Sequence, residues 1–426
     1  MYLADRSAPQ GASSAQDRLR GTARAVSPTV LALGTVSLIT DVSTEMVTAV
    51  LPLYLVMGLG LSPLGFGMLD GVQNGVSALV QLTGGHLADR VRNHKLIAGI
   101  GYGLSALAKP LLLVGSLGTL GVALALDRTG KGLRTAPRDA LISLSVPPER
   151  QGRAFGLHRA MDTTGALLGP ILAFLILSVA VGGYDAVFAV SGCVAALGVL
   201  VLLLFVPSGK KAAAAATTPA APAPVPAPER PDLRAAFGLL RGRRLRALFG
   251  CAVLLGLTTV SDAFLYLLLQ RRTGVPEQLF PLLPLGTAAV FLLLALPAGR
   301  LADRIGRRTV FLAGHACLLL GYGLLLWAPD LPALPYLVLA LHGVFYAATD
   351  GVLPAAVAAV VPERLRASGI ALVGTGQALA RFCCSLLFGA VWAAWGDGPA
   401  LASAAVGLAC CAAVAGAVLR PTGDPR

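Results

Sequence analysis

The segment GHLADRV at residues 85–91 returns as GRLADRI at residues 299–305, and this repeat decides the fold. Its two aspartates, Asp89 and Asp303, are 214 residues apart, which is about half of the 426-residue chain. A repeat at this spacing predicts a chain that is built from two similar halves.

Both copies of the repeat follow long apolar segments, and such segments fill most of the chain. Hydrophobic residues make up 56% of the sequence and charged residues 13%, whereas soluble domains carry about 25% charged residues. The apolar runs reach about 20 residues, which is enough for a helix to cross a bilayer. Only helices and closed barrels satisfy the backbone in lipid, and these runs lack the alternation of barrel strands. The sequence therefore predicts an all-α membrane protein.

We expect twelve transmembrane helices in two six-helix, pseudo-symmetric halves. The runs lie at about 29–57, 64–86, 96–116, 118–142, 154–180 and 184–206, and then at about 246–269, 276–298, 309–328, 333–360, 367–394 and 400–419. An Ala- and Pro-rich stretch with the composition of an extended linker separates the two sets. The expected domains are a polar tail (1–28), an N-terminal bundle (29–206), a basic linker (207–245), a C-terminal bundle (246–419) and a second tail (420–426).

The net charge of +13 does not indicate nucleic-acid binding, because the basic residues gather on one side of the predicted membrane. Most of the 34 Lys and Arg residues fall in the tails and in the loops of that side, whereas the opposite loops hold only Arg271 and Arg272. This asymmetry is the positive-inside pattern, so we expect both termini and the linker in the cytoplasm. The Ala-, Gly- and Arg-rich composition is typical of high-GC bacteria, which predicts the plasma membrane.

The sequence motifs do not indicate an enzyme, a metal site or a cofactor. The chain contains no H-E-x-x-H, G-x-S-x-G or P-loop pattern. Its seven cysteines lie in apolar segments and form no C-x-x-C pair, which favours small apolar residues over metal ligands or disulfides. We therefore expect a membrane protein that is not an enzyme.

Two further motifs join the repeat, and together they resemble the major facilitator superfamily over nearly the whole chain. The second copy of the repeat, residues 299–308, is a complete G-x-L-A-D-R-x-G-R-R signature, and the first departs from it at residues 92–94. Residues 128–132, RTGKG, are similar to the family's R-x-x-Q-G pattern with Lys in place of Gln. Residues 165–170, GALLGP, are similar to the G-x-x-x-G-P motif of the antiporter branch, although Ala and Phe stand at residues 173–174 where two glycines usually follow.

The resemblance implies a monomeric secondary active transporter that carries a small molecule by alternating access. In this family the first, fourth, seventh and tenth helices line the central cavity. The helix-5 motif, with Gly165, Gly169 and Pro170, favours proton-coupled efflux by antiport. The alternative is a proton-coupled importer of a polar or anionic metabolite, because the same carboxylates can couple movement in either direction.

Charged residues inside the apolar segments are the candidates for proton coupling. Each costs about 2.5–3.5 kcal/mol at the bilayer centre unless it is paired or hydrated. Asp41 and Glu45 share one face of the first helix, where mutual repulsion and burial disfavour two charged carboxylates, so one is expected to bind and release a proton. Arg128 of the fourth helix is the expected relay partner. The competing interpretation is that these carboxylates form structural ion pairs with bases of the fourth helix.

The predicted substrate cavity takes polar residues from several helices. They are Gln73, Asn74, Lys131, Asp262, Asp350 and Arg381. Because the fourth helix is strongly basic, we expect a substrate with a polar or anionic group. Because the second half holds fewer charges, we expect the coupling machinery mainly in the first half.

The two repeat loops are expected to act as gates between the halves. An acidic residue there can cap the positive N-terminus of a neighbouring helix across the interface, and nearby arginines can change partners when the halves rock. The gate residues are Gly85, Asp89, Arg90, Gly299, Asp303, Arg304 and Arg307. The competing interpretation is that these loops carry only topology signals.

Overall fold

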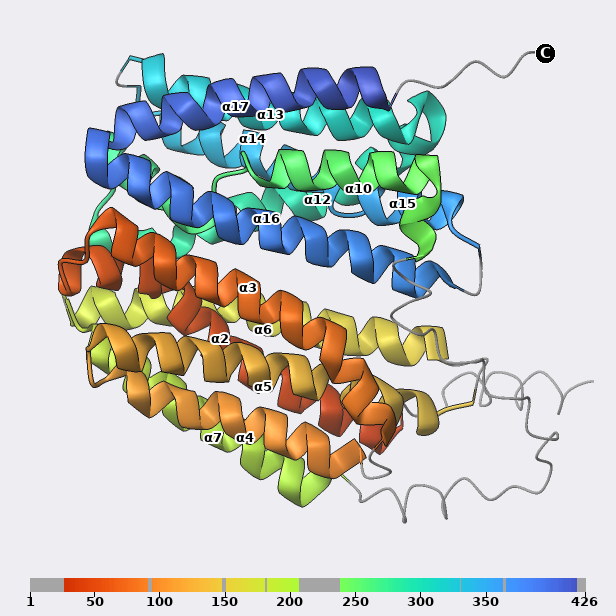
Figure 1. Ribbon diagram of the computed structural model, residues 1–426. Helices are drawn as coiled ribbons and strands as arrows, with labels where there is room; N and C mark the ends of the chain where they lie inside the picture. Colours follow the sequence, from red (N-terminus) through yellow and green to blue (C-terminus); the bar gives the residue numbers. More distant parts are fainter. Residues whose placement is uncertain are drawn as a thin grey trace, which may run out of the picture.

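The computed structural model describes residues 27–90, 94–147, 151–180, 182–206, 238–329, 331–362 and 365–419, and its elements there are helices. The first half forms α2 (Pro28–Leu53) with a π-helical end η1 (Tyr54–Gly58), α3 (Pro63–Arg90), α4 (His94–Leu112), α5 (Leu117–Leu144), α6 (Gln151–Val179) and α7 (Tyr184–Phe205). The second half forms η3 (Leu239–Arg241), α10 (Arg243–Gly256), α11 (Asp262–Thr273), η4 (Glu277–Leu282), α12 (Leu283–Ile305), α13 (Arg307–Trp327), α14 (Leu334–Thr349), α15 (Val352–Val360), α16 (Arg366–Trp395) and α17 (Asp397–Val418). Figure 1 shows the two halves as two bundles that lie side by side.

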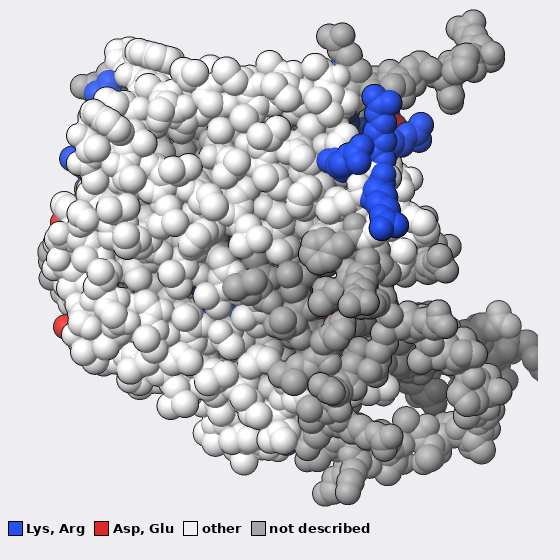
Figure 2. Space-filling model, viewed as in Figure 1, with Lys and Arg blue, Asp and Glu red and all other residues white. Residues whose placement is uncertain are grey.

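The helices build a multi-pass membrane protein. Eight helical stretches among the described residues are long and apolar enough to cross a membrane. The helices α10 and α11, with 14 and 12 residues, are each too short to qualify alone. On the face shown in Figure 2, the described surface between the two ends of the molecule is almost free of charged side chains, as contact with lipid requires. The number of twelve spans stays a prediction.

Two apolar runs that we expected to be single helices are broken. The run 246–269 forms α10 and α11, and the run 333–360 forms α14 and α15. In the first gap, the backbone N–H of Val260 donates to the hydroxyl of Tyr322 at 2.9 Å. Non-helical backbone is tolerated at membrane depth only where protein or a cavity satisfies it, and hydropathy alone does not reveal such a break.

The two halves touch through α3 and α16, where glycines allow the backbones to approach closely. A Cβ on Gly67 would lie 2.5 Å from the carbonyl oxygen of Ser385, and a Cβ on Gly389 would lie 2.5 Å from the carbonyl oxygen of Pro63. Neither position can hold a side chain unless the helices separate, because real Cβ atoms do not approach other atoms within 3.0 Å. Small residues are the usual means of close helix packing in membranes.

An aromatic cluster adds to this contact between the halves. Phe264 of α11 packs against Phe66 of α3 with ring centroids 4.6 Å apart, and against Phe388 and Trp392 of α16 at 4.8 and 5.6 Å. These contacts lie where α3 begins and α16 ends, which is the end of the bundle opposite the one where α7 finishes and η3 begins. We call it the far end, and these contacts close the far end.

The other end of the molecule, which we call the linker end, is strongly basic. Arg241, Arg243, Arg244 and Arg246 are exposed there at the start of the second half. Figure 2 shows a cluster of blue Lys and Arg side chains at this end. The helix α2 begins at this end and α17 finishes there (Figure 1). The described chain ends therefore share the basic side of the molecule.

Candidate functional site

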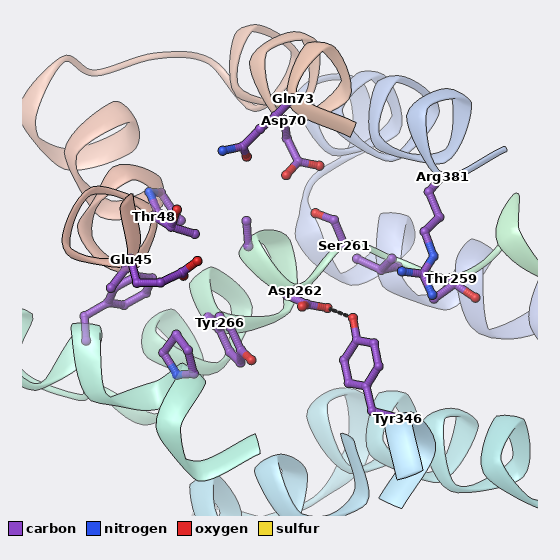
Figure 3. Close-up of a pocket in the computed structure, with 16 residues that line it drawn as sticks. Glu45, Thr48, Asp70, Gln73, Thr259, Ser261, Asp262, Tyr266, Tyr346 and Arg381 are labelled. Carbon is purple, nitrogen blue, oxygen red and sulfur yellow. Dashed lines mark hydrogen bonds between the residues drawn. The ribbon is translucent and has the colours of Figure 1, made fainter. Parts of the chain in front are cut away.

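A cavity of about 260 Å³ lies between the two halves at the break between α10 and α11. Its wall combines α2 and α3 of the first half with α11, η4, α12, α14 and α16 of the second. The polar residues of the wall are Glu45, Thr48, Asp70, Gln73, Thr259, Ser261, Asp262, Tyr266, Tyr346 and Arg381. Figure 3 shows their side chains arranged around one common space. The site therefore depends on both halves, as a site for alternating access must.

The cavity is richer in acid than in base. Its ionisable side chains at ordinary pH are the carboxylates of Glu45, Asp70 and Asp262 and the guanidinium of Arg381. Glu45 forms no hydrogen bond or ion pair with the described residues, and its carboxylate points into the cavity in Figure 3. An unpaired carboxylate in a cavity is available to a ligand, since its solvation there is not replaced by a protein partner.

Asp262 is held by two partners from α14. The hydroxyl of Tyr346 donates to its Oδ1 at 2.6 Å, and Nε2 of His342 lies 3.4 Å from the same oxygen. Asp262 is also the first residue of α11, where the positive helix N-terminus favours a carboxylate. The break in the helix thus presents an acidic side chain to the cavity from a fixed position.

Asp70 links the halves directly beside the cavity. Its Oδ2 accepts a hydrogen bond of 2.5 Å from the hydroxyl of Ser385 on α16. Arg381 lies one turn away on the same helix, and its buried Nε finds no hydrogen-bond partner in the described structure. In Figure 3 its guanidinium extends toward Thr259 at the helix break.

The three residues predicted to couple protons lie in two different places. Glu45 lines the cavity, but Asp41 is buried inside the first half, where it lies 3.4 Å from Arg134. Arg128 lies 3.6 Å from Asp127. The structure therefore brings only Glu45 of this group to the cavity between the halves, and the competing interpretation of ion pairing describes the contacts of Asp41.

A network of buried charges occupies the interior of the first half. Lys109, only 2% exposed, donates to Asp127 at 2.9 Å, and Arg138 lies 3.7 Å from Asp162. These pairs join α4, α5 and α6 and offset the charges within the bundle. Lys131, predicted for the cavity, belongs to this region and acts electrostatically on Asp41.

Only some of the other residues predicted for the cavity lie in its wall. Gln73, Asp262 and Arg381 line the cavity, and their role toward a substrate stays a prediction. Asp350 is exposed at the break between α14 and α15 and is not part of the wall. The side chain of Asn74 lies outside the described structure.

The helix-5 motif packs α6 against α2. A Cβ on Gly165 would lie 2.4 Å from the carbonyl oxygen of Leu38, and a Cβ on Gly169 would lie 2.8 Å from the Cβ of Glu45. Pro170 is buried inside α6. The two glycines therefore set the position of the α2 segment that carries Glu45 to the cavity.

The second repeat is not a loop as expected, because residues 299–305 are the last turns of α12, and it is tied to its own half. Gly306, with φ of 97°, separates α12 from α13, and Asp303 lies 3.8 Å from Arg307. Arg307 also donates to the carbonyl of Ala355 on α15 at 2.7 Å, and Arg308 donates to a carbonyl of α17.

Among the gate residues with described surroundings, Arg304 and Gly299 show no contact across the halves. Arg304 is exposed, and Gly299 has open space where a side chain would lie. The first repeat is not a loop up to Arg90 either, because residues 85–90 are the end of α3, and the side chains of Asp89 and Arg90 and the surroundings of Gly85 lie outside the described structure. The gate role of both repeats stays a prediction.

Sequence reasoning missed His342, Tyr346 and Ser385 as parts of the site. His342 and Tyr346 are four residues apart in an apolar helix and therefore share one face, which is a signal that the sequence contains. Ser385 is an ordinary small polar residue, and only its distance to Asp70 reveals its place.

The chain matches a family model and is similar to several known proteins. The family model of the Major Facilitator Superfamily matches residues 33–292 and 259–426. An uncharacterized MFS-type transporter of Methanocaldococcus jannaschii is 29% identical over 380 residues, which cover 87% of this chain and 89% of that protein. An uncharacterized protein of Mycobacterium tuberculosis is 34% identical over 158 residues, which cover 36% of this chain and 38% of that protein.

Solved structures share the fold. The nucleoside transporter NupG is similar with a TM-score of 0.76 and 15% identity, over 92% of this chain and 99% of that chain. A bacterial homolog of the human lysosomal transporter Spinster, in an inward-facing and unoccupied conformation, is similar with a TM-score of 0.68 and 17% identity, over 92% of this chain and 94% of that chain. At these identities the likeness concerns the fold alone.

Proposed function

The chain belongs to the major facilitator superfamily, and on this premise we propose that it exports a small polar compound in exchange for protons. Membership makes it a multi-pass membrane protein that carries a small molecule by secondary transport. The proposal concerns the direction of transport, the coupling ion and the kind of compound.

The observation that carries the proposal is the acid-rich cavity between the halves. Glu45, Asp70 and Asp262 face one guanidinium, that of Arg381, around a space of about 260 Å³. Carboxylates in a cavity can bind either a proton or a cationic group, so both ligands compete for the same negative charge. Such competition is what an antiporter needs, because the two ligands must not cross together.

The charge of the wall also bears on the substrate. The bases of α5 that suggested an anionic substrate, such as Lys131, do not line this cavity. The surplus of carboxylates supports a compound with a cationic or hydrogen-bonding polar group, with Glu45 as its partner. Hydroxyl groups of Thr48, Tyr266 and Tyr346 can supply hydrogen bonds to the rest of the molecule.

The helix-5 motif supports export over import. The motif resembles that of the antiporter branch of the family. Its glycines pack α6 on the part of α2 that carries Glu45. A proton-coupled importer is the alternative, since the same carboxylates would then bind proton and substrate together.

The proposed cycle uses the two ends of the molecule in turn. The far end is closed by α3, α11 and α16, so the cycle requires these contacts to open when the linker end closes. We place the linker end in the cytoplasm by the positive-inside rule and the protein in the plasma membrane. One chain supplies both halves of the cavity, which supports a monomer as the working unit.

Everted membrane vesicles from cells that express the protein test this proposal. Respiration acidifies the vesicle interior, and a pH-sensitive dye reports proton release when candidate compounds are added one at a time. We expect release with cationic or zwitterionic polar compounds. Glu45→Gln should abolish the release, because the amide cannot exchange a proton or balance a cation.

The matched control is Asp139→Asn, since Asp139 lies outside the cavity wall and contacts Arg138 nearer the linker end. This variant should retain compound-dependent release. Uptake of the same compounds together with protons would overturn the export proposal, and equal activity of Glu45→Gln and wild type would overturn the role of the cavity.

A further inference from the structure

We propose that Asp262, His342 and Tyr346 form a second proton-binding site, which lies in the C-terminal half and opens to the cavity. The coupling role of this site rests on the proposed function, but the binding of a proton there does not. The proposal departs from the expectation that the coupling machinery lies mainly in the first half.

The geometry joins three titratable groups at one oxygen. Oδ1 of Asp262 accepts a hydrogen bond of 2.6 Å from Tyr346, and Nε2 of His342 lies 3.4 Å away. The distance from His342 allows a hydrogen bond after a small shift, and it is within reach of an ion pair when the imidazole is protonated. A proton that enters can therefore reside on the carboxylate or on the ring.

The two main partners differ in their exposure. The side chain of Asp262 is 46% accessible, because it opens into the cavity, whereas that of His342 is 1% accessible. A proton from cavity water must therefore reach His342 through Asp262 or through hydroxyl groups around the ring. This arrangement separates a buried proton acceptor from the solvent by a single carboxylate.

The far side of the imidazole is also connected. Nδ1 of His342 lies 3.4 Å from Oγ1 of Thr287, and the hydroxyl of Tyr266 donates to the same oxygen at 3.1 Å. A hydroxyl oxygen has two lone pairs, so Thr287 can accept from both Tyr266 and a protonated Nδ1. The surroundings can thus stabilise both the neutral and the charged ring.

Other titratable and charged groups face this site from the neighbouring helices. They are Glu45 on α2, Asp70 on α3, Tyr266 on α11, Tyr322 on α13, Asp350 after α14 and Arg381 on α16. The site therefore lies among more carboxylates than bases, and one added proton reduces the net negative charge that the cavity offers to a cationic ligand.

Proton binding also changes a contact between the two broken helices. Tyr346 of α14 donates to the carboxylate of Asp262 on α11, and a hydrogen bond to a charged acceptor is roughly twice as strong as a neutral one. Protonation of Asp262 weakens this link, whereas protonation of His342 keeps the carboxylate charged and preserves it. Whether Asp262 or His342 holds the proton can therefore change the packing of α11 against α14.

Nuclear magnetic resonance of the purified protein with ¹⁵N-labelled histidine tests the proposal without any substrate. The chain has five histidines, and His342→Gln identifies the signal of His342 by its loss. We expect the ring nitrogens of His342 to change with pH. Asp262→Asn should displace the midpoint of that change by about one pH unit or more, which is tenfold in proton affinity.

His315 provides a matched control inside the same spectra. It is equally buried, but its Nδ1 contacts the carbonyl oxygen of Phe311 instead of a carboxylate. Its signal should not respond to Asp262→Asn. Tyr346→Phe removes one hydroxyl only and should shift the His342 midpoint by a smaller amount, which keeps the test available if Asp262→Asn does not fold.

Two results would overturn the proposal: a His342 signal that does not change over the pH range in which the protein is folded, or a midpoint that neither variant moves. Failure of the proposed function is distinguishable, because the titration would persist while wild-type vesicles released no protons with any compound.

Discussion

Gly67→Ala tests whether the glycine contact between α3 and α16 keeps the far end closed. The added Cβ would lie 2.5 Å from the carbonyl oxygen of Ser385, and ordinary van der Waals contact begins at 3.4 Å. The two helices must therefore separate by about 1 Å at this point, because a backbone carbonyl in a helix cannot turn away. The strain exists only while the far end is closed.

The size of the effect follows from overpacking. Extra methyl groups in well-packed interiors cost about 1–3 kcal/mol. If that strain applies to the closed state alone, it shifts the equilibrium toward a state open at the far end by about 5- to 150-fold. Gly65→Ala is the matched control on the same helix, since the nearest atom to its Cβ would be the Ser62 hydroxyl oxygen at 3.5 Å, which is ordinary van der Waals contact.

The assay measures access to the cavity from the far end. Thr48→Cys places a thiol in the cavity wall, in a protein whose seven native cysteines are replaced. A membrane-impermeant maleimide, added to the side of the far end, should label this thiol faster in Gly67→Ala than in Gly65→Ala. Equal labelling rates in the two variants would refute the reasoning, because the contact would then not hold the far end closed.

Three further changes separate packing, buried charge and ligand binding. Gly165→Ala should lower the melting temperature of the purified protein, because its Cβ would lie 2.4 Å from a carbonyl of α2, whereas Gly156→Ala, with open space around it, should not. Lys109→Met should lower the free energy of unfolding by about 3 kcal/mol in a denaturation assay, since it removes the main partner of buried Asp127. The double variant Lys109→Met with Asp127→Leu should recover part of this loss, because it leaves no unpaired buried charge at this pair. Glu45→Gln should change stability by less than about 0.5 kcal/mol, because Glu45 has no hydrogen-bond or ion-pair partner among the described residues. It should nevertheless abolish binding of transported compounds in a calorimetric titration.

The helices could be predicted from the sequence because their signal is local. Runs of apolar residues mark helices in lipid: the run at 367–394 matches α16 to within one residue at each end, and the run at 64–86 lies within α3, which continues to Arg90. The break after α10 could not be predicted in this way. The N–H of Val260 is satisfied by Tyr322, which is 62 residues further along the chain. Such a partner depends on the packing of two helices, and hydropathy contains no information about it.

Part of the candidate site could be predicted because a charged residue in an apolar segment is also a local signal. This signal indicated Glu45, Asp262 and Arg381, which line the cavity. The sequence could not show that Asp41, only one turn from Glu45, turns into the first half toward Arg134. Asp41 forms an ion pair because it meets Arg134, which is 93 residues further along the chain. The sequence of the α2 face that carries Asp41 and Glu45 does not reveal which neighbouring helix each carboxylate meets.

The most direct test of the central claim is a flux measurement with purified protein in proteoliposomes. The vesicles have an acidic interior, and a compound identified in the everted vesicles is supplied outside. Our account predicts that the compound accumulates inside while protons leave, and that Glu45→Gln abolishes both movements. Accumulation that requires an alkaline interior, or that proceeds equally without a pH gradient, would contradict it.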